Sequence, residues 1–284
     1  AALFARQICY CSANSHARKR TGAGGRTICY NCWYMRPLVQ KIKPSRGFSH
    51  ALYLLLNMLL PLTVFMLVRT GFVSVAIGVI LLSKWRMFAV RPRFWLANIR
   101  TNAVDLIIGL SVLALMDGTQ TNWLQLLYAF LWILWLIFIK PRNDVLWVSL
   151  QALSAQAVGL TAVFSAFDHQ PLMVLVLAVG FICFFCAHHF FYSFDEEHIR
   201  ALAYIWAYFG AALTWILGHW LIYYYHVIAQ PTLLLFTLAF SLGTLYYLDH
   251  FDKLSKSIRR QVIFILITII SVIVVFSDWG DKIV

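Results

Sequence analysis

Nine apolar runs follow one another between residues 51 and 276, with short polar connections between them. About 20 apolar residues allow an α-helix to cross the hydrocarbon core of a bilayer, so such runs are typical of transmembrane helices. Hydrophobic residues make up 62% of the chain and charged residues 12%, whereas an ordinary soluble domain is about 25% charged. The sequence therefore excludes a soluble globular enzyme, a disordered chain and a coiled coil, and predicts an all-α polytopic membrane protein.

The boundaries of the nine expected spans follow from the hydrophobic pattern. The second run is short, which predicts a tilted helix or one extended by residues 85–90. An interfacial stretch at residues 94–100 precedes the third run. Pro141, Pro171 and Pro231 mark three span entries, since proline is tolerated at helix starts. The spans are expected at residues 51–68, 72–82, 103–116, 123–139, 145–167, 172–194, 201–226, 232–248 and 262–276.

Positive charge is distributed unevenly among the connections. The chain carries 23 Lys and Arg against 11 Asp and Glu, a net charge of +12. With a cytoplasmic N-terminus, 21 of these 23 basic residues fall inside, and only Arg69 and Lys282 fall outside. Because Lys and Arg gather on the cytoplasmic side, the pattern predicts the N-terminus in and the C-terminus out. A second run that only re-enters the membrane would invert the later spans and remove this asymmetry.

A cytoplasmic tail, residues 1–48, is expected ahead of the membrane domain, residues 49–284. It contains two close cysteine pairs, formed by Cys9, Cys11, Cys29 and Cys32. Four thiolates can enclose one tetrahedral Zn²⁺ and leave no open position, so the pattern predicts a zinc-ribbon-like module with structural zinc. His16 could replace one cysteine. Four unligated thiols, an iron–sulfur site and a redox pair are the alternatives.

The same tail holds nine Lys and Arg residues and no apolar stretch long enough for the core of a cleavable signal peptide. Basic segments beside a membrane attract anionic lipid headgroups. We expect the basic inner surface to meet the lipid bilayer and the tail to dock a cytosolic protein partner. Binding of nucleic acid is the weaker alternative.

The expected span 145–167 is the richest in polar residues. At about 100° per residue, four of them fall within an arc of about 80° on one helix face. They are Gln151, Ser154, Thr161 and Ser165. This stripe could line a polar pathway, or it could hydrogen-bond to neighbouring helices, as such residues often do in membranes.

Asp105 is an acidic residue inside the expected third span, near its inner end. An ionisable group at membrane depth is costly and marks a candidate site. We expect it to pair with a basic residue at the interface, such as Arg93 or Arg100. A role in moving a proton or cation is the alternative.

Histidines and acids form two further candidate clusters at the span ends. One lies at the inner edge and contains His189, Glu196, Glu197 and His198. The other is expected at the outer ends of two spans and contains Asp168, His169, His219 and His226. Either could hold a metal ion or a proton. A solvated turn for the first cluster and an interfacial histidine within an aromatic belt for the second are the favoured alternatives.

The order of Glu196 and His219 faintly resembles intramembrane CAAX-type proteases, which carry paired glutamates and an aromatic-x-x-x-His motif. His219 lies 23 residues beyond Glu196, which is about 34 Å along a continuous helix. The two groups could not then share a metal or a water, so this interpretation is set aside unless Gly210 breaks the helix.

Residues 91–106, with the sequence RPRFWLANIRTNAVDL, and the pair His219-Trp220 resemble segments of uncharacterised multi-pass membrane proteins of candidate-phyla bacteria. The likeness extends over the third to ninth spans. It implies a bacterial inner-membrane location and no activity that can be carried over.

Three function classes stay open. A binding or assembly component is favoured, because the chain has a dense basic inner surface and a closed metal site but no catalytic constellation. A small-solute or ion transporter or channel could use the stripe of the fifth span together with Asp105. A membrane-embedded enzyme, lipid-modifying or protease-like, could use His189 and Glu196 at the inner edge.

Overall fold

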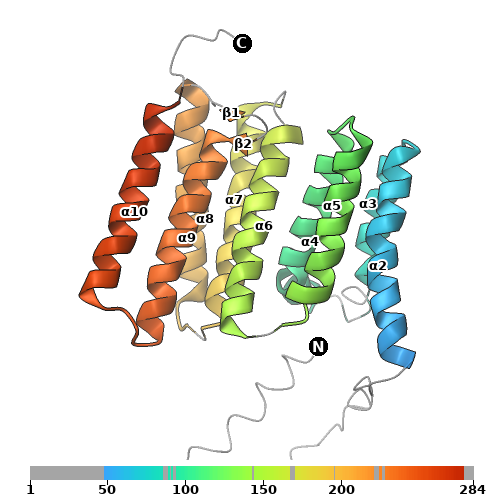
Figure 1. The fold of residues 1–284 in the computed structure, drawn as a ribbon, viewed down its shortest axis with the longest axis horizontal. Coiled ribbons are helices and arrows are strands. Elements are labelled where there is room, and N and C mark those ends of the chain that lie inside the picture. Colours follow the sequence, from blue (N-terminus) through green and yellow to red (C-terminus); the bar gives the residue numbers. More distant parts are fainter. Residues whose placement is uncertain are drawn as a thin grey trace, which may run out of the picture. The chain divides into compact units, whose positions relative to one another are not determined.

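The computed structural model is an up-and-down bundle of helices closed by one short hairpin (Figure 1). It describes residues 48–277 except 86–88, 90, 92–93, 143, 167–169, 195, 221–223 and 226–227. The elements are α2 (Phe48–Arg69), α3 (Val73–Ser83), α4 (Trp95–Asp117), α5 (Asn122–Leu134), η5 (Trp135–Ile139), α6 (Val145–Ala166), α7 (Leu172–Tyr192), α8 (Ile199–Trp220), β1 (Tyr224–Tyr225), β2 (Ile228–Ala229), α9 (Gln230–His250) and α10 (Lys256–Val275).

Each apolar run of the sequence corresponds to a helix in the described part of the chain. Seven of these helices are long and apolar enough to cross a membrane. The apolar stretches Leu54–Arg69 and Val73–Ser83 are shorter. Large apolar side chains also cover the outside of the bundle, among them Phe264 and Val275 of α10, which are 70% and 74% exposed. Such a surface requires a lipid environment, and the prediction of a multi-pass α-helical membrane protein is confirmed.

The short helix α3 packs antiparallel to α2 after a tight turn. Gly71 makes this turn possible, because its φ of +79° lies in the left-handed region that favours glycine. The 11 residues of α3 extend over only about 16 Å. The helix stops at Lys84, whose backbone N–H caps the carbonyls of Leu81 and Leu82.

The helix that follows α4 does not keep one geometry to its end. The run expected as a uniform span at 123–139 divides into α5 and the π-helical turn η5. A π turn widens the helix, and such bulges are frequent at functional sites. Trp135 and Leu136 of η5 are buried in the core, and Lys140 follows directly as its C-cap.

The expected span 201–226 is wrong at its C-terminal end, because α8 ends at Trp220. Tyr224 and Tyr225 instead pair with Ala229 and Ile228 in the antiparallel hairpin β1–β2. Consecutive tyrosines favour the extended strand conformation over the helix.

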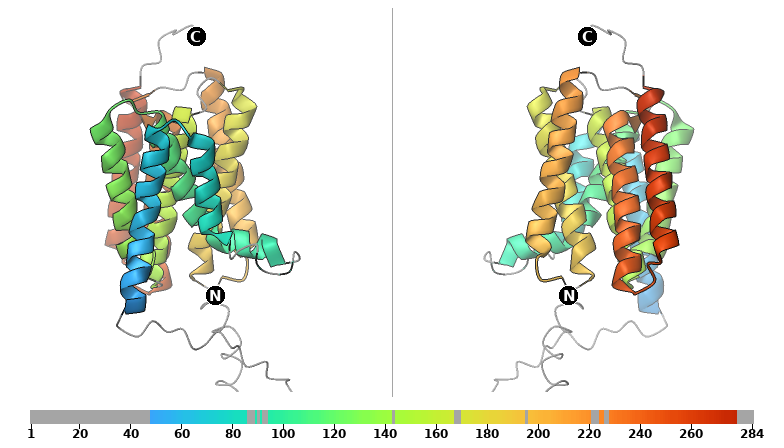
Figure 2. Two further views of the ribbon diagram at one scale, coloured as in Figure 1. Left: turned by 90° about the vertical axis from the view of Figure 1, so that its right-hand side faces the viewer. Right: turned by 90° about the vertical axis from the view of Figure 1, so that its left-hand side faces the viewer.

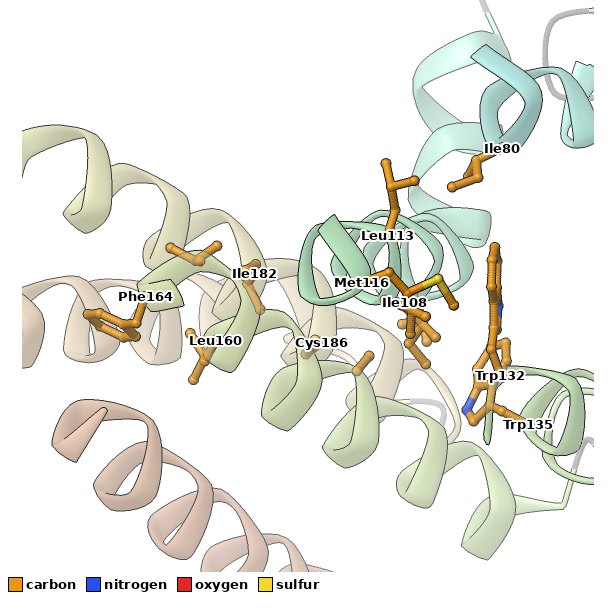
Figure 3. Close-up of a cluster of buried hydrophobic side chains, with 14 of the residues drawn as sticks. Ile80, Ile108, Leu113, Met116, Trp132, Trp135, Leu160, Phe164, Ile182 and Cys186 are labelled. Carbon is orange, nitrogen blue, oxygen red and sulfur yellow. The ribbon is translucent and has the colours of Figure 1, made fainter. Parts of the chain in front are cut away.

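The core lies where α4, α5, α6 and α7 meet, and Figure 3 shows part of it. Met116, Trp132 and Phe164 are almost completely buried there. Small residues allow α7 and α8 to pack closely along their length. A Cβ on Gly210 of α8 would lie 2.7 Å from the Sγ atom of Cys183 in α7, so glycine is required for this approach.

Candidate functional site

Basic residues gather at one end of the bundle, which we call the basic end. It carries the connections α3–α4, α5–α6, α7–α8 and α9–α10, at the bottom of Figure 1. The described Lys and Arg residues of this end are Lys84, Arg91, Arg100, Lys140, Arg142, Arg200, Lys253, Lys256, Arg259 and Arg260. Among the described residues, Arg69 is the only Lys or Arg at the opposite end.

Asp105 forms an ion-pair cluster with two lysines near the basic end. Its Oδ2 atom lies 2.6 Å from Nζ of Lys84 and 2.8 Å from Nζ of Lys140. The three side chains come from α4, from the end of α3 and from the end of η5. These partners differ from the expected Arg93, which lies outside the described residues, and Arg100. The cluster ties three helix ends together, and it carries a net charge of +1 when all three groups are ionised.

Burial dominates the electrostatics of this cluster. The side chains of Lys84, Asp105 and Lys140 are only 16%, 14% and 25% exposed. Burial lowers the pKa of the Lys84 ammonium to about 8; Asp105 opposes this shift and Lys140 adds to it. One carboxylate thus holds two partly buried ammonium groups, which makes Asp105 a structural counterion.

Gln151 closes the turn between η5 and α6. Its Nε2 atom donates hydrogen bonds to the carbonyls of Ile139 at 2.8 Å and Arg142 at 3.1 Å. Its Oε1 atom lies 3.3 Å from Nε2 of His189 in α7. Carbonyls at a helix end have no partner within the helix, so this side chain adds a donor to the Ile139 carbonyl, which also accepts from the backbone N–H of Arg142 at 3.3 Å, and supplies one to the Arg142 carbonyl in the turn.

The remaining members of the predicted stripe bond within their own helix. The hydroxyls of Ser154, Thr161 and Ser165 donate to the carbonyls of Gln151, Ala157 and Thr161, at 3.0, 2.8 and 2.8 Å. Ser165 is exposed, whereas Gln151 is buried. The four residues share a face of α6, but their hydrogen bonds turn toward the backbone.

The members of the predicted inner-edge cluster have different hydrogen-bond partners. His189 faces Gln151, whereas Glu196 accepts a hydrogen bond from the hydroxyl of Tyr246 in α9. Glu197 and His198 are exposed. Within the described ranges, no group of three His, Cys, Asp or Glu residues is arranged to hold a metal ion.

At the opposite end, His219 is exposed, and its Nδ1–H donates to the carbonyl of Trp215 at 3.0 Å. The other predicted members of that cluster, Asp168, His169 and His226, lie outside the described residues. The same holds for the zinc-ribbon cysteines Cys9, Cys11, Cys29 and Cys32. Both assignments stay predictions.

A cavity of about 530 Å³ lies between α6, α7, α8 and α9, toward the basic end. We call it the α8–α9 cleft, because these two helices contact each other little, whereas α7–α8 and α9–α10 pack as pairs (Figure 2, right). Ile205 of α8 and Leu242 of α9 line the cleft and are 66% and 47% exposed. The cleft is therefore open sideways, on the apolar surface of the bundle. Its volume lies in the range of about 300–1,000 Å³ typical of ligand pockets.

One amide stands in the otherwise apolar wall of this cleft. Gln156 of α6 is 3% exposed, and its Oε1 atom accepts a hydrogen bond from Nε1 of Trp206 at 3.3 Å. Its Nε2 atom is buried and has no hydrogen-bond partner within the described structure. Gln156 falls outside the arc of the predicted stripe, so sequence reasoning missed it. A glutamine in the middle of an apolar run was the available signal.

Charged and polar groups gather at the basic end of the cleft. Asp249 at the end of α9, Arg259 in the first turns of α10 and Tyr246 line it there. Asp249 and Arg259 are exposed and form no ion pair with each other in the described part of the chain. The cleft thus joins an apolar interior to a rim carrying both signs of charge. An amphiphilic molecule has the same arrangement, with an apolar part and a polar or charged end.

No model of a known protein family matches the chain, and neither does any curated protein or solved structure. The function must therefore be argued from the site itself.

Proposed function

We propose that this protein is a binding component of the membrane whose membrane domain takes up a hydrophobic guest sideways, through the α8–α9 cleft. The observation that carries the proposal is the cleft itself: about 530 Å³, lined mainly by apolar side chains and bordered by the exposed Ile205 and Leu242. A molecule dissolved in the bilayer reaches such an opening without crossing water.

The proposal includes the topology expected from the sequence. The nine helices, the short α3 included, alternate in direction, with the N-terminus in the cytoplasm and the basic end facing it, in a bacterial inner membrane. The distribution of described Lys and Arg residues supports this orientation. The tail, residues 1–48, folds around zinc through its four cysteines and docks a cytosolic protein, so that the membrane domain and the tail serve one assembly.

Two observations favour this function over transport along the stripe of α6. The stripe hydroxyls are engaged by backbone carbonyls of their own helix. Asp105 is neutralised by Lys84 and Lys140, whereas a cation pathway requires a carboxylate that can exchange partners. The enzyme alternative has less support, since His189 and Glu196 are held by different partners.

A cavity-filling variant with a matched control tests the proposal. Gly243 lines the cleft, and a Cβ there would meet only the ring of Phe190, at 3.5 Å. The side chain of Gly243→Leu extends into the cavity. Gly78→Leu is the control, because a Cβ on Gly78 meets nothing within 4 Å.

Native mass spectrometry of the protein, extracted gently from its own membrane, provides the measurement. We expect the wild type and Gly78→Leu to retain added mass in the range of a lipid, and Gly243→Leu to lose it. An additional protein subunit and one zinc per chain would support the assigned role of the tail. A wild type without any bound amphiphile refutes the proposed function of the cleft.

A further inference from the structure

We infer that the guest of the α8–α9 cleft is a zwitterionic glycerophospholipid with an amine in its headgroup. Its phosphate meets Arg259, its ammonium meets Asp249, and an ester carbonyl accepts a hydrogen bond from Gln156. The inference rests on the proposed function and adds the chemical class of the ligand.

The buried amide is the first step of the argument. Four other buried side-chain atoms lack partners in the described structure, on Gln125, Trp135, Gln230 and Thr232. None of these residues lines the cleft, whereas Gln156 does. An unsatisfied donor within the hydrocarbon region costs several kcal/mol, so the guest must offer an acceptor there. A pure hydrocarbon offers none.

The depth of Gln156 identifies this acceptor. Its partner Trp206 lies seven residues into α8 from Ile199, which is about 10 Å along the helix axis. That level is beneath the charged rim and above the middle of the bilayer. In a glycerophospholipid, the acyl ester carbonyls lie just beneath the phosphate, and the hydrocarbon chains continue inward.

The rim supplies the second recognition element. Arg259 presents a guanidinium group, whose fork of N–H donors suits a phosphate. Asp249 presents a carboxylate that also lines the cleft. Tyr246 stands beside it and donates its hydroxyl proton to a further carboxylate, Glu196. A purely anionic headgroup would be repelled by these acids, whereas an ammonium group is attracted to them.

The apolar wall accommodates the rest of the molecule. Cys186, Ala187 and Phe190 of α7 and Leu242 of α9 line the cleft. The opening between α8 and α9 allows one acyl chain to enter while the other stays in the bilayer. The cleft then holds part of a lipid without having to enclose the whole.

The test compares defined lipids on the full chain. Protein stripped of lipid in detergent is mixed with phosphatidylethanolamine, phosphatidylglycerol and diacylglycerol of the same acyl chains, and the bound species are counted by native mass spectrometry. We expect phosphatidylethanolamine to exceed phosphatidylglycerol by about ten-fold, as for one hydrogen bond to a charged group. Equal retention, or a preference for the anionic lipid, overturns the inference while leaving the proposed function intact. Retention of none of them contradicts both.

Charge variants with neighbouring controls assign the headgroup contacts. Arg259→Gln is expected to reduce both phospholipids about ten-fold and to leave diacylglycerol unchanged. Asp249→Asn is expected to abolish the preference for phosphatidylethanolamine. Arg260→Gln and Asp252→Asn are the controls, because neither residue lines the cleft. Asp252 has φ +54°, which asparagine tolerates. If Arg260→Gln and Asp252→Asn change lipid binding as much as Arg259→Gln and Asp249→Asn do, the effect comes from surface charge, and the assigned headgroup contacts are wrong.

The ester contact is tested by an ether lipid. Diether phosphatidylethanolamine keeps the headgroup and chains but lacks both carbonyls. The wild type is expected to prefer the diester lipid about five-fold, as for one hydrogen bond. Gln156→Leu removes the donor and should bind the two lipids equally. If the wild type binds them equally while Gly243→Leu still excludes both, the cleft holds lipid but Gln156 does not read the ester.

Discussion

Asp105→Asn is the substitution with the clearest expected cost, because it removes one counterion from two ammonium groups. Asp105 lies 2.6 Å from Lys84 and 2.8 Å from Lys140, and all three side chains are at least 75% buried. Breaking a buried ion pair costs about 3–5 kcal/mol, since the remaining charge stays uncompensated. Partial exposure of Lys140 favours the lower end, about 3 kcal/mol, so the midpoint of thermal unfolding should fall by about 6–12 °C.

Thermal unfolding in detergent, followed by circular dichroism, measures this shift, and Lys140→Met is the matched comparison. That variant leaves one lysine with one carboxylate, a neutral pair at 2.6 Å. We expect its cost to stay below about 1 kcal/mol, since the Lys84–Asp105 pair that remains leaves no buried charge uncompensated. The counterion assignment is wrong if the unfolding midpoint of Asp105→Asn lies within about 2 °C of the wild type. It is also wrong if Lys140→Met lowers the midpoint as much as Asp105→Asn does.

Three further predictions concern pH and packing, and each is checked by the same melts. Burial lowers the pKa of Lys84 to about 8, whereas the pKa in an unfolded chain is about 10.4. Between these two pH values the unfolded state binds more protons than the folded state, so the free energy of unfolding should rise from pH 8 to 10. A fall over this range contradicts the prediction. Gln151→Leu removes the side-chain donor to the carbonyls of Ile139 and Arg142 at the end of η5 and should cost about 1–3 kcal/mol; an unchanged melt argues against capping. Gly210→Ala places a Cβ 2.7 Å from Sγ of Cys183 and should cost about 1–3 kcal/mol. A Cβ on Gly180 would lie 3.6 Å from the Cβ of Ala211, which is an ordinary contact, so Gly180→Ala should cost nothing. Cys183→Ala should rescue Gly210→Ala.

Hydrophobic pattern and span length were enough to predict the architecture, because in lipid only closed backbone structures cross a membrane. The pattern could not predict where α8 ends, since the aromatic run after Trp220 is as apolar as the helix before it. It also could not predict η5. A π turn adds one residue to a helical turn without changing its composition.

The partners of the predicted polar residues were harder to obtain from sequence. Helical periodicity places Gln151 and Ser154 on one face of α6, but it carries no information on which helix lies opposite. The partners of Asp105, at positions 84 and 140, are separated from it by 21 and 35 residues. They meet only because three helices end at the same level. A search near Asp105 in sequence therefore favoured arginines that are not its partners.

Three buried glutamines show why polarity alone did not identify the site. Gln125 donates to the carbonyls of Met116 and Thr119 after α4, and Gln151 does the same for the end of η5. In both residues the Nε2 donor is satisfied at a helix end; the Oε1 atom of Gln125 has no partner in the described structure, but it is an acceptor and does not line the cleft. The Oε1 atom of Gln156 accepts a hydrogen bond from Trp206, but its Nε2 donor has no partner within the described chain and the residue borders a cavity. Because an unsatisfied donor is costly in lipid, its retention points to an acceptor supplied from outside. This asymmetry, rather than the number of polar residues, directs the functional argument from α6 to the α8–α9 cleft.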